Sequence, residues 1–184
     1  LDKAMRDLVQ AILASPIPVV TFVAPNGARA ASAGTYIAYA SHVAAMAPAT
    51  NIGSSTPVSI APGPSPGTPT EPPADDKPPA ENPMDAMGRK VVNDAVAYLQ
   101  SLAELRGRNI EWAEKTVREG ANLRASEALE ANVIDLIAED VPALLAAIDE
   151  FAVKGSDRPM TLATRDAELV IIESDWRHDV LKTI

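Results

Sequence analysis

The chain has 184 residues, 47% of them hydrophobic and only 4% aromatic, which fits one globular domain with an aliphatic core. Its net charge of −9 argues against a nucleic-acid surface, which needs clustered Lys and Arg. The absence of cysteine excludes disulfides, thiolate metal sites and a cysteine nucleophile, and the two histidines, His42 and His178, lack metal-ligand spacing.

The first 55 residues alternate between helical and strand patterns. The predicted elements are a helix at 2–14, a buried strand at 17–24, a helix at 32–41, a strand at 43–47 and a short strand from Asn51. No apolar run reaches the ~18 residues of a membrane span, and no signal peptide is present. Because the chain begins at Leu1 inside an amphipathic pattern, we interpret it as a piece of a longer protein.

A proline-rich segment follows. Ten of the 28 residues from Thr56 to Pro83 are proline, which prevents a helix or a central strand. We predict a flexible polyproline-like loop at 56–83. Two interpretations of this loop stay open, namely a tolerated surface insertion and a lid or recognition loop.

The second half again alternates helices and strands. The predicted elements are a helix from about Asp85 to Arg106, a helix at 110–119 capped by Asn109 and ended by Gly120, a helix at 125–131 ended by Asn132, a strand at 133–137, a helix capped by Asp140 and a last strand at 169–172. This alternation favours an α/β fold with a mostly parallel sheet and flanking helices.

Ser32 is the first candidate functional residue. It lies among very small side chains, in the run from Ala28 to Thr35, where the predicted strand passes into a helix. Such a position leaves the hydroxyl uncrowded and puts backbone N–H groups beside it. The alternative is that the small residues of this run only let a helix pack closely on a sheet; they are Ala30, Ala31, Ala33 and Gly34.

A serine nucleophile needs a base. His42 lies ten residues after Ser32, about 15 Å along the same helix, and His178 lies in a polar tail, so both are interpreted as ordinary histidines. Lys90 is the other candidate, with Met87 and Val91 as apolar neighbours. A lysine base must be neutral, which requires a dry site that lowers a lysine pKa from ~10.4 by roughly three units. A solvated lysine is the alternative.

Four stretches resemble the NfeD family of membrane-bound serine proteases, which belongs to the ClpP/crotonase superfamily and is similar to signal peptide peptidase A. These stretches are Val23–Ala38, Met46–Gly53, Lys90–Ala103 and Ser126–Asp135, so the resemblance covers most of the chain outside 56–83. It implies a Ser–Lys dyad of Ser32 and Lys90, an oxyanion donor in the backbone N–H of Ala33, and no metal or cofactor.

The resemblance also implies a biological setting. It points to a serine endopeptidase that cleaves hydrophobic segments of membrane-associated proteins, with a stomatin-like partner and a homo-oligomer, most simply a dimer. It implies a membrane-anchored parent protein with this domain on the extracytoplasmic side. The corresponding domain boundaries are a serine-bearing part at 1–55, the loop at 56–83, the lysine-bearing part at 84–172, and a tail at 173–184 that leads to the membrane region.

The chain also departs from the family pattern. Relatives carry a strand and a Gly-Gly turn before the first helix, which supply part of the sheet and a second oxyanion donor, and we expect this unit to be missing here. The separation of Ser32 and Lys90 is longer than in the family because of the proline-rich insertion. Two rival functions remain, a non-catalytic scaffold for a stomatin-like partner and a crotonase-type acyl-CoA enzyme.

Overall fold

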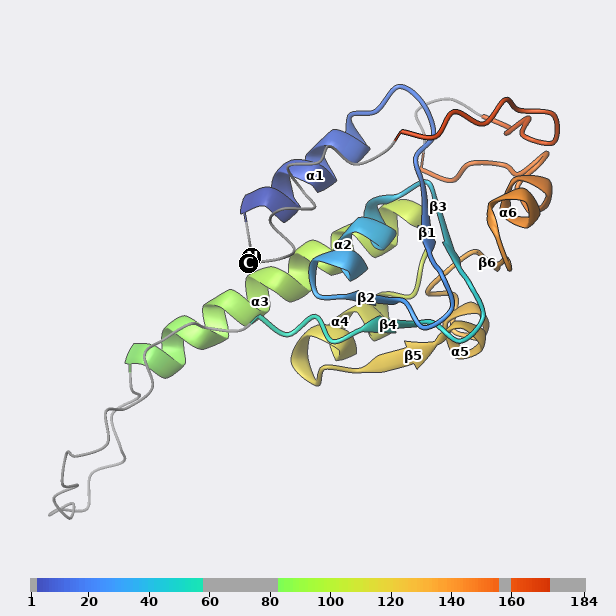
Figure 1. Ribbon diagram of the computed structural model, residues 1–184. Helices are drawn as coiled ribbons and strands as arrows, with labels where there is room; N and C mark the ends of the chain where they lie inside the picture. Colours follow the sequence, from blue (N-terminus) through green and yellow to red (C-terminus); the bar gives the residue numbers. More distant parts are fainter. Residues whose placement is uncertain (1–2, 58–82, 156–159, 173–184) are drawn as a thin grey trace, which may run out of the picture.

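The computed structural model describes residues 3–57, 83–155 and 160–172. Its helices and strands are shown in Figure 1. In chain order they are α1 (Lys3–Leu13), β1 (Val20–Val23), β2 (Arg29–Ala31), α2 (Ala33–Ala40), β3 (Val43–Met46), β4 (Asn51–Gly53), α3 (Pro83–Arg106), α4 (Ile110–Arg118), β5 (Asn122–Arg124), α5 (Ala125–Glu130), β6 (Leu136–Ile137) and α6 (Val141–Ala147).

The strands form two small sheets. The first has the order β1-β3-β6, with parallel pairing throughout. The second has the order β2-β4-β5, in which β2 and β4 are parallel while β4 and β5 are antiparallel. The predicted α/β fold with a mostly parallel sheet and flanking helices is therefore confirmed.

The first sheet is covered on both faces. Successive side chains of a strand point to opposite sides, so β3 contributes to the packing on each face. Ala44 and Met46 of β3 join the main core with α1, α2 and α3, whereas Val43 and Ala45 pack against α6. Figure 1 shows this arrangement, with α1, α2 and α3 on one side of β1 and β3 and α6 on the other. Helix α2 thus lies in the centre of the molecule.

Most predicted helix boundaries are confirmed by their caps. The Asn109 side chain accepts a hydrogen bond from the Trp112 backbone N–H at 2.8 Å, and Asp140 does the same for Ala143. Gly120 and Asn132 adopt positive φ angles of 68° and 55°, as expected of residues that end a helix. The proline-rich segment from 58 to 82 lies outside the described residues, and α3 begins immediately after it.

Two strand predictions need correction. The predicted strand at 133–137 is reduced to Leu136–Ile137, because the N–H groups of Val133 and Ile134 both bond to the Ala128 carbonyl and close the end of α5. The strand predicted at 169–172 is wrong: these residues form no strand and are 55% to 90% exposed. An apolar, β-branched run becomes a strand only where a sheet edge is in reach to pair with it.

Two strands were not predicted, β2 and β5. Each has three residues, too few to show an alternating pattern. Among the described helices, none combines the length and the hydropathy needed to cross a membrane.

Candidate active site

Ser32 lies at the junction between β2 and α2, with its side chain exposed. Its backbone has φ 50° and ψ −113°, a conformation that residues other than glycine rarely adopt. Holding a non-glycine residue in such a region costs of order 1–3 kcal/mol, and residues of this kind gather at active sites. The strained backbone projects the serine away from the core at the start of the helix.

Helix capping does not explain this serine. Serine is a common N-cap residue because its hydroxyl accepts a hydrogen bond from a backbone N–H in the first turn. At Ser32, the N-cap of α2, the side chain makes no capping hydrogen bond. The residue type at this position therefore needs another reason, and an exposed hydroxyl beside a helix N-terminus suits nucleophilic chemistry.

Two backbone hydrogen bonds and the Thr35 side chain hold the Ser32 turn. The Ser32 N–H donates to the Gly53 carbonyl at 3.3 Å, and the Thr35 N–H donates to the Ser32 carbonyl at 3.0 Å. The buried Thr35 hydroxyl lies 3.2 Å from the carbonyl oxygens of both Ala30 and Gly53. The ends of β2 and β4 and the first turn of α2 are thereby joined around the serine.

Two glycines let these elements approach. A Cβ added to Gly34 would lie 3.4 Å from the Ala30 Cβ, so the packing role that small residues have at this junction is real. Gly53 is more constrained, because its φ is 139° and an added Cβ would lie 2.2 Å from the Ala121 carbonyl oxygen. The Gly53 carbonyl, which accepts the Ser32 N–H, is thus held by a close approach that only glycine permits.

The backbone N–H of Ala33 is the first of α2. The first N–H groups of a helix have no intrahelical acceptor and lie at the positive end of the helix dipole. This group directly follows Ser32 in the chain, a position that makes it a candidate donor to an oxyanion.

Lys90 lies in the N-terminal part of α3, and its side chain is exposed. In the described part of the chain, no hydrogen bond or ion pair joins it to Ser32. The dry surroundings that a lysine base requires are therefore not formed around Lys90 by the described residues.

The two helices nevertheless run in the same direction. The Tyr36 hydroxyl, in the first half of α2, donates to the Ala95 carbonyl in the middle of α3 at 3.2 Å. At the far ends, the Arg106 Nε donates to the Ala40 carbonyl at 2.9 Å. Ser32 precedes the first contact by about 6 Å along α2, and Lys90 precedes it by about 7.5 Å along α3. Both residues thus lie at the same end of the helix pair.

His42 is not part of this site. It is buried beyond the C-terminal end of α2, and its Nδ1 accepts a hydrogen bond from the Val19 N–H at 3.1 Å. Burial, with Arg106 and Arg108 nearby, lowers the pKa of His42 below its usual value. The interpretation of His42 as an ordinary, satisfied histidine is confirmed, while His178 lies outside the described residues.

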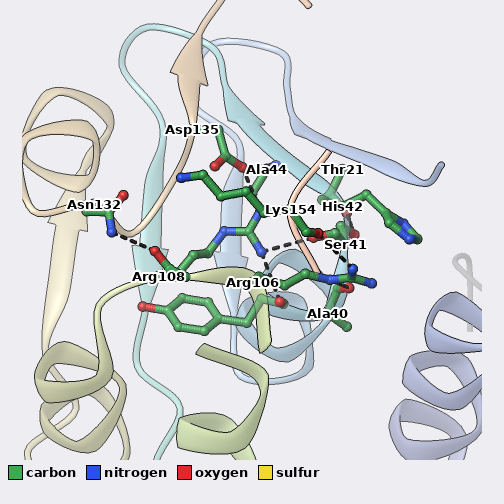
Figure 2. Close-up of polar contacts among 12 residues, drawn as sticks. Thr21, Ala40, Ser41, His42, Ala44, Arg106, Arg108, Asn132, Asp135 and Lys154 are labelled. Carbon is green, nitrogen blue, oxygen red and sulfur yellow. Dashed lines mark hydrogen bonds and ion pairs between the residues drawn. The ribbon is translucent and has the colours of Figure 1, made fainter. Parts of the chain in front are cut away.

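Two arginines that the sequence interpretation missed hold the C-terminal end of α2 (Figure 2). Arg108 donates through Nη1 to the carbonyls of Tyr39 and Ser41 and through Nη2 to the Asp135 carboxylate at 2.6 Å. The side chains of Arg108 and Asp135 are only 2% and 8% exposed. We call Arg106, Arg108 and Asp135 the α2 clamp.

The two arginines of the clamp connect α2 to other parts of the fold, Arg108 through Asp135. Arg106 connects the Ala40 carbonyl to the carbonyls of Lys154 and Gly155, and Asp135 also accepts the backbone N–H of Ala44 in β3. Cationic groups at a helix C-terminus stabilise its carbonyl dipoles. The clamp therefore fixes the end of α2 opposite Ser32.

The described residues contain no group of three His, Asp or Glu side chains that suits a metal ion.

The chain is similar to known membrane-bound proteases, although no protein-family model matches it. It is 40% identical over 142 residues to the membrane-bound protease PH1510 of Pyrococcus horikoshii. That alignment covers 77% of this chain and 28% of the protease, so the chain spans well under a third of this curated relative.

The solved structures it resembles are those of the 1510-N membrane-bound stomatin-specific protease. A lysine-to-alanine mutant in complex with a substrate peptide has a TM-score of 0.79 and 32% identity, covering 100% of this chain and 77% of that one. A serine-to-alanine mutant has a TM-score of 0.75 and 34% identity, covering 95% and 77%. The 1510-N protease specific for a stomatin homolog from Pyrococcus horikoshii has a TM-score of 0.75 and 31% identity, covering 100% and 75%.

Proposed function

The chain belongs to the family of the 1510-N membrane-bound proteases, and we propose that it is a proteolytic domain with Ser32 as nucleophile and Lys90 as general base. The observation that carries the proposal is the exposed, positive-φ Ser32, whose hydroxyl makes no capping bond beside the first N–H groups of α2. Related structures of a serine-to-alanine and a lysine-to-alanine mutant involve the same two residue types as the proposed dyad.

The chemistry follows from these groups. Neutral Lys90 Nζ takes the proton from Ser32 Oγ as the oxygen attacks the peptide carbonyl carbon. The Ala33 N–H stabilises the oxyanion of the tetrahedral intermediate. When the C–N bond breaks, Lys90 gives its proton to the leaving amine, and an acyl-enzyme remains on Ser32. Lys90 then deprotonates a water molecule that hydrolyses this ester and restores the serine.

The exposure of Lys90 sets a condition on this mechanism. A lysine in water is protonated at neutral pH and cannot act as a base. We infer that a bound apolar peptide, or a second copy of the chain, excludes water from Lys90 when the site is loaded. The apolar character of the substrate would then both allow the site to recognise it and lower the pKa of the lysine base by excluding water.

We extend the proposal to the substrate and setting by family resemblance. The substrates are hydrophobic segments of membrane-associated proteins, with a stomatin-like protein as the partner, since the related 1510-N protease is stomatin-specific. The active form is a homo-oligomer, most simply a dimer. The whole protein is membrane-anchored, with this domain on the extracytoplasmic side.

Cleavage of an apolar peptide by the purified chain, followed by mass spectrometry, tests the proposal. Cleavage is expected with the unmodified chain and is expected to disappear in Ser32→Ala and Lys90→Ala. Matched controls are Ser101→Ala and Lys115→Ala, which remove an exposed serine and an exposed lysine elsewhere and should leave cleavage unchanged. Cleavage that survives Ser32→Ala contradicts the proposal, and binding of a stomatin-like partner without cleavage favours the scaffold.

A further inference from the structure

We propose that Thr35 is a positioning residue, whose buried hydroxyl holds Ser32 in its positive-φ conformation. This inference rests on the proposed role of Ser32 as the nucleophile. It assigns a function to a side chain that touches neither substrate nor the reacting atoms.

The Thr35 side chain connects two strand ends. Thr35 is fully buried in the first turn of α2, and its Oγ1 is 3.2 Å from the Ala30 carbonyl and 3.2 Å from the Gly53 carbonyl. A hydroxyl has one hydrogen, so the two carbonyls share a single donor. Ala30 lies in β2, which leads into Ser32, and Gly53 ends the neighbouring strand β4.

The same carbonyl also holds Ser32 directly. The Gly53 oxygen accepts the Ser32 N–H at 3.3 Å, while the Thr35 N–H donates to the Ser32 carbonyl at 3.0 Å. Thr35 therefore binds the peptide group after Ser32 through its backbone and steadies the acceptor of the peptide group before Ser32 through its side chain. A dihedral pair as unfavourable as φ 50°, ψ −113° persists only where surrounding contacts fix both peptide groups.

Packing alone does not require this hydroxyl. Threonine within a helix commonly bonds to a carbonyl three or four residues earlier in the same helix. Here the acceptors are Ala30, which lies before the helix, and Gly53, which lies on another strand. Valine has the same shape as threonine and would fill the same buried volume without bonding to either strand.

The test compares variants that separate shape from hydrogen bonding. Thr35→Val keeps the shape and removes the hydroxyl, whereas Thr35→Ser keeps the hydroxyl and removes a methyl group. Thr50→Val is the matched control, because Thr50 is also buried and its hydroxyl bonds to the Ala47 carbonyl, at the other end of β4. Thr35→Ala, which favours helix formation, is a second hydroxyl-free variant in case Thr35→Val does not fold.

Two readouts are needed, the rate of labelling by a fluorophosphonate and the φ-sensitive three-bond coupling of the Ser32 amide by NMR. We expect labelling of the hydroxyl-free variants to slow by about 10- to 100-fold, while Thr35→Ser and Thr50→Val stay within about threefold of the unmodified chain. The Ser32 coupling should change in the hydroxyl-free variants and be restored in Thr35→Ser.

Unchanged labelling in a folded hydroxyl-free variant overturns the proposal, as does a Thr35→Ser variant as slow as Thr35→Val. If the unmodified chain never labels, the proposed function fails, and the coupling alone decides on Thr35. In that case a Ser32 coupling that is unaltered by loss of the hydroxyl overturns the positioning role, and an altered one supports it.

Discussion

The two ends of α2 are built in opposite ways. At the C-terminal end, the α2 clamp buries two arginines and a carboxylate against the last carbonyls of the helix. At the N-terminal end, Ser32 is exposed, its hydroxyl makes no capping bond, and its backbone is strained. One end is held by several long-range contacts, whereas the other presents an exposed serine hydroxyl.

With Ser32 as the proposed nucleophile, this difference separates the residues that stabilise α2 from the residue assigned to the chemistry. A strained residue is kept only if its neighbourhood is rigid. The clamp joins α2 to the end of α3, to β3 and to the segment at Lys154 and Gly155. These contacts hold the helix in place without any contribution from its first turn. Changes to the exposed Ser32 side chain should therefore alter activity with little loss of stability, and changes at the clamp should do the reverse.

The largest expected effect comes from Ser32→Ala. Cleavage of an apolar peptide should fall to background, because the only proposed nucleophile is removed. The free energy of unfolding should change by less than about 0.5 kcal/mol, because the exposed hydroxyl makes no capping bond. Peptide cleavage and urea denaturation measure the two quantities. A large loss of stability would show that the serine is a structural residue.

Lys90→Ala should lower kcat/KM by about 10²- to 10⁴-fold, the usual contribution of a general base. Its exposed side chain should again leave the melting temperature nearly unchanged. Lys115→Ala serves as the control for removing an exposed lysine. Equal activities of the two variants would remove Lys90 from the mechanism without touching the assignment of Ser32.

Arg108→Met should destabilise the protein at the C-terminal end of α2. It leaves the Asp135 carboxylate buried without its cation, which typically costs about 3–5 kcal/mol of unfolding free energy. Arg118→Met removes an arginine from an exposed ion pair with Glu114 and should cost less than about 1 kcal/mol. Denaturant unfolding of both variants checks the comparison, and similar values for the two would contradict a structural role for the clamp.

The smallest effect concerns the pH dependence of stability that comes from His42, which lies near the two arginines of the clamp. Burial and the charges of Arg106 and Arg108 lower the pKa of His42 in the folded state, so the unfolded chain binds a proton more readily. The contribution of His42 to stability is therefore complete above its unfolded pKa of about 6.5 and is lost as the pH falls towards the lower folded value. His42→Gln should flatten the slope of unfolding free energy between about pH 5 and 7. An unchanged slope would assign it to other groups.

Much of the N-terminal end could be predicted from sequence because its signals are local. Small residues around Ser32, the β-branched run before it and the helical pattern after it lie within about twenty positions. The strain at Ser32 could not be predicted, since it depends on the Gly53 carbonyl and the Thr35 hydroxyl. The spatial relation of Ser32 to Lys90 also depends on tertiary contacts, through Tyr36 and Ala95.

The clamp escaped prediction for the same reason. Its hydrogen bonds join residues 27 to 91 positions apart, and in the sequence Arg106 and Arg108 look like ordinary cations around a helix end. The segment at 169–172 shows the opposite error, since its strong β propensity met no sheet edge and gave no strand. Local sequence patterns therefore predicted most of the helices and identified Ser32 as a candidate. The contacts that hold these elements together depend on the tertiary fold and could not be predicted.

The most direct measurement is the site of covalent modification by a fluorophosphonate, mapped by peptide mass spectrometry on the folded chain. We expect one adduct, on the peptide that carries Ser32, formed at a rate that depends on Lys90. An adduct on another serine, such as Ser54 or Ser55 beside the same strand end, would contradict it. So would the absence of any adduct in a folded, oligomeric preparation that binds an apolar peptide.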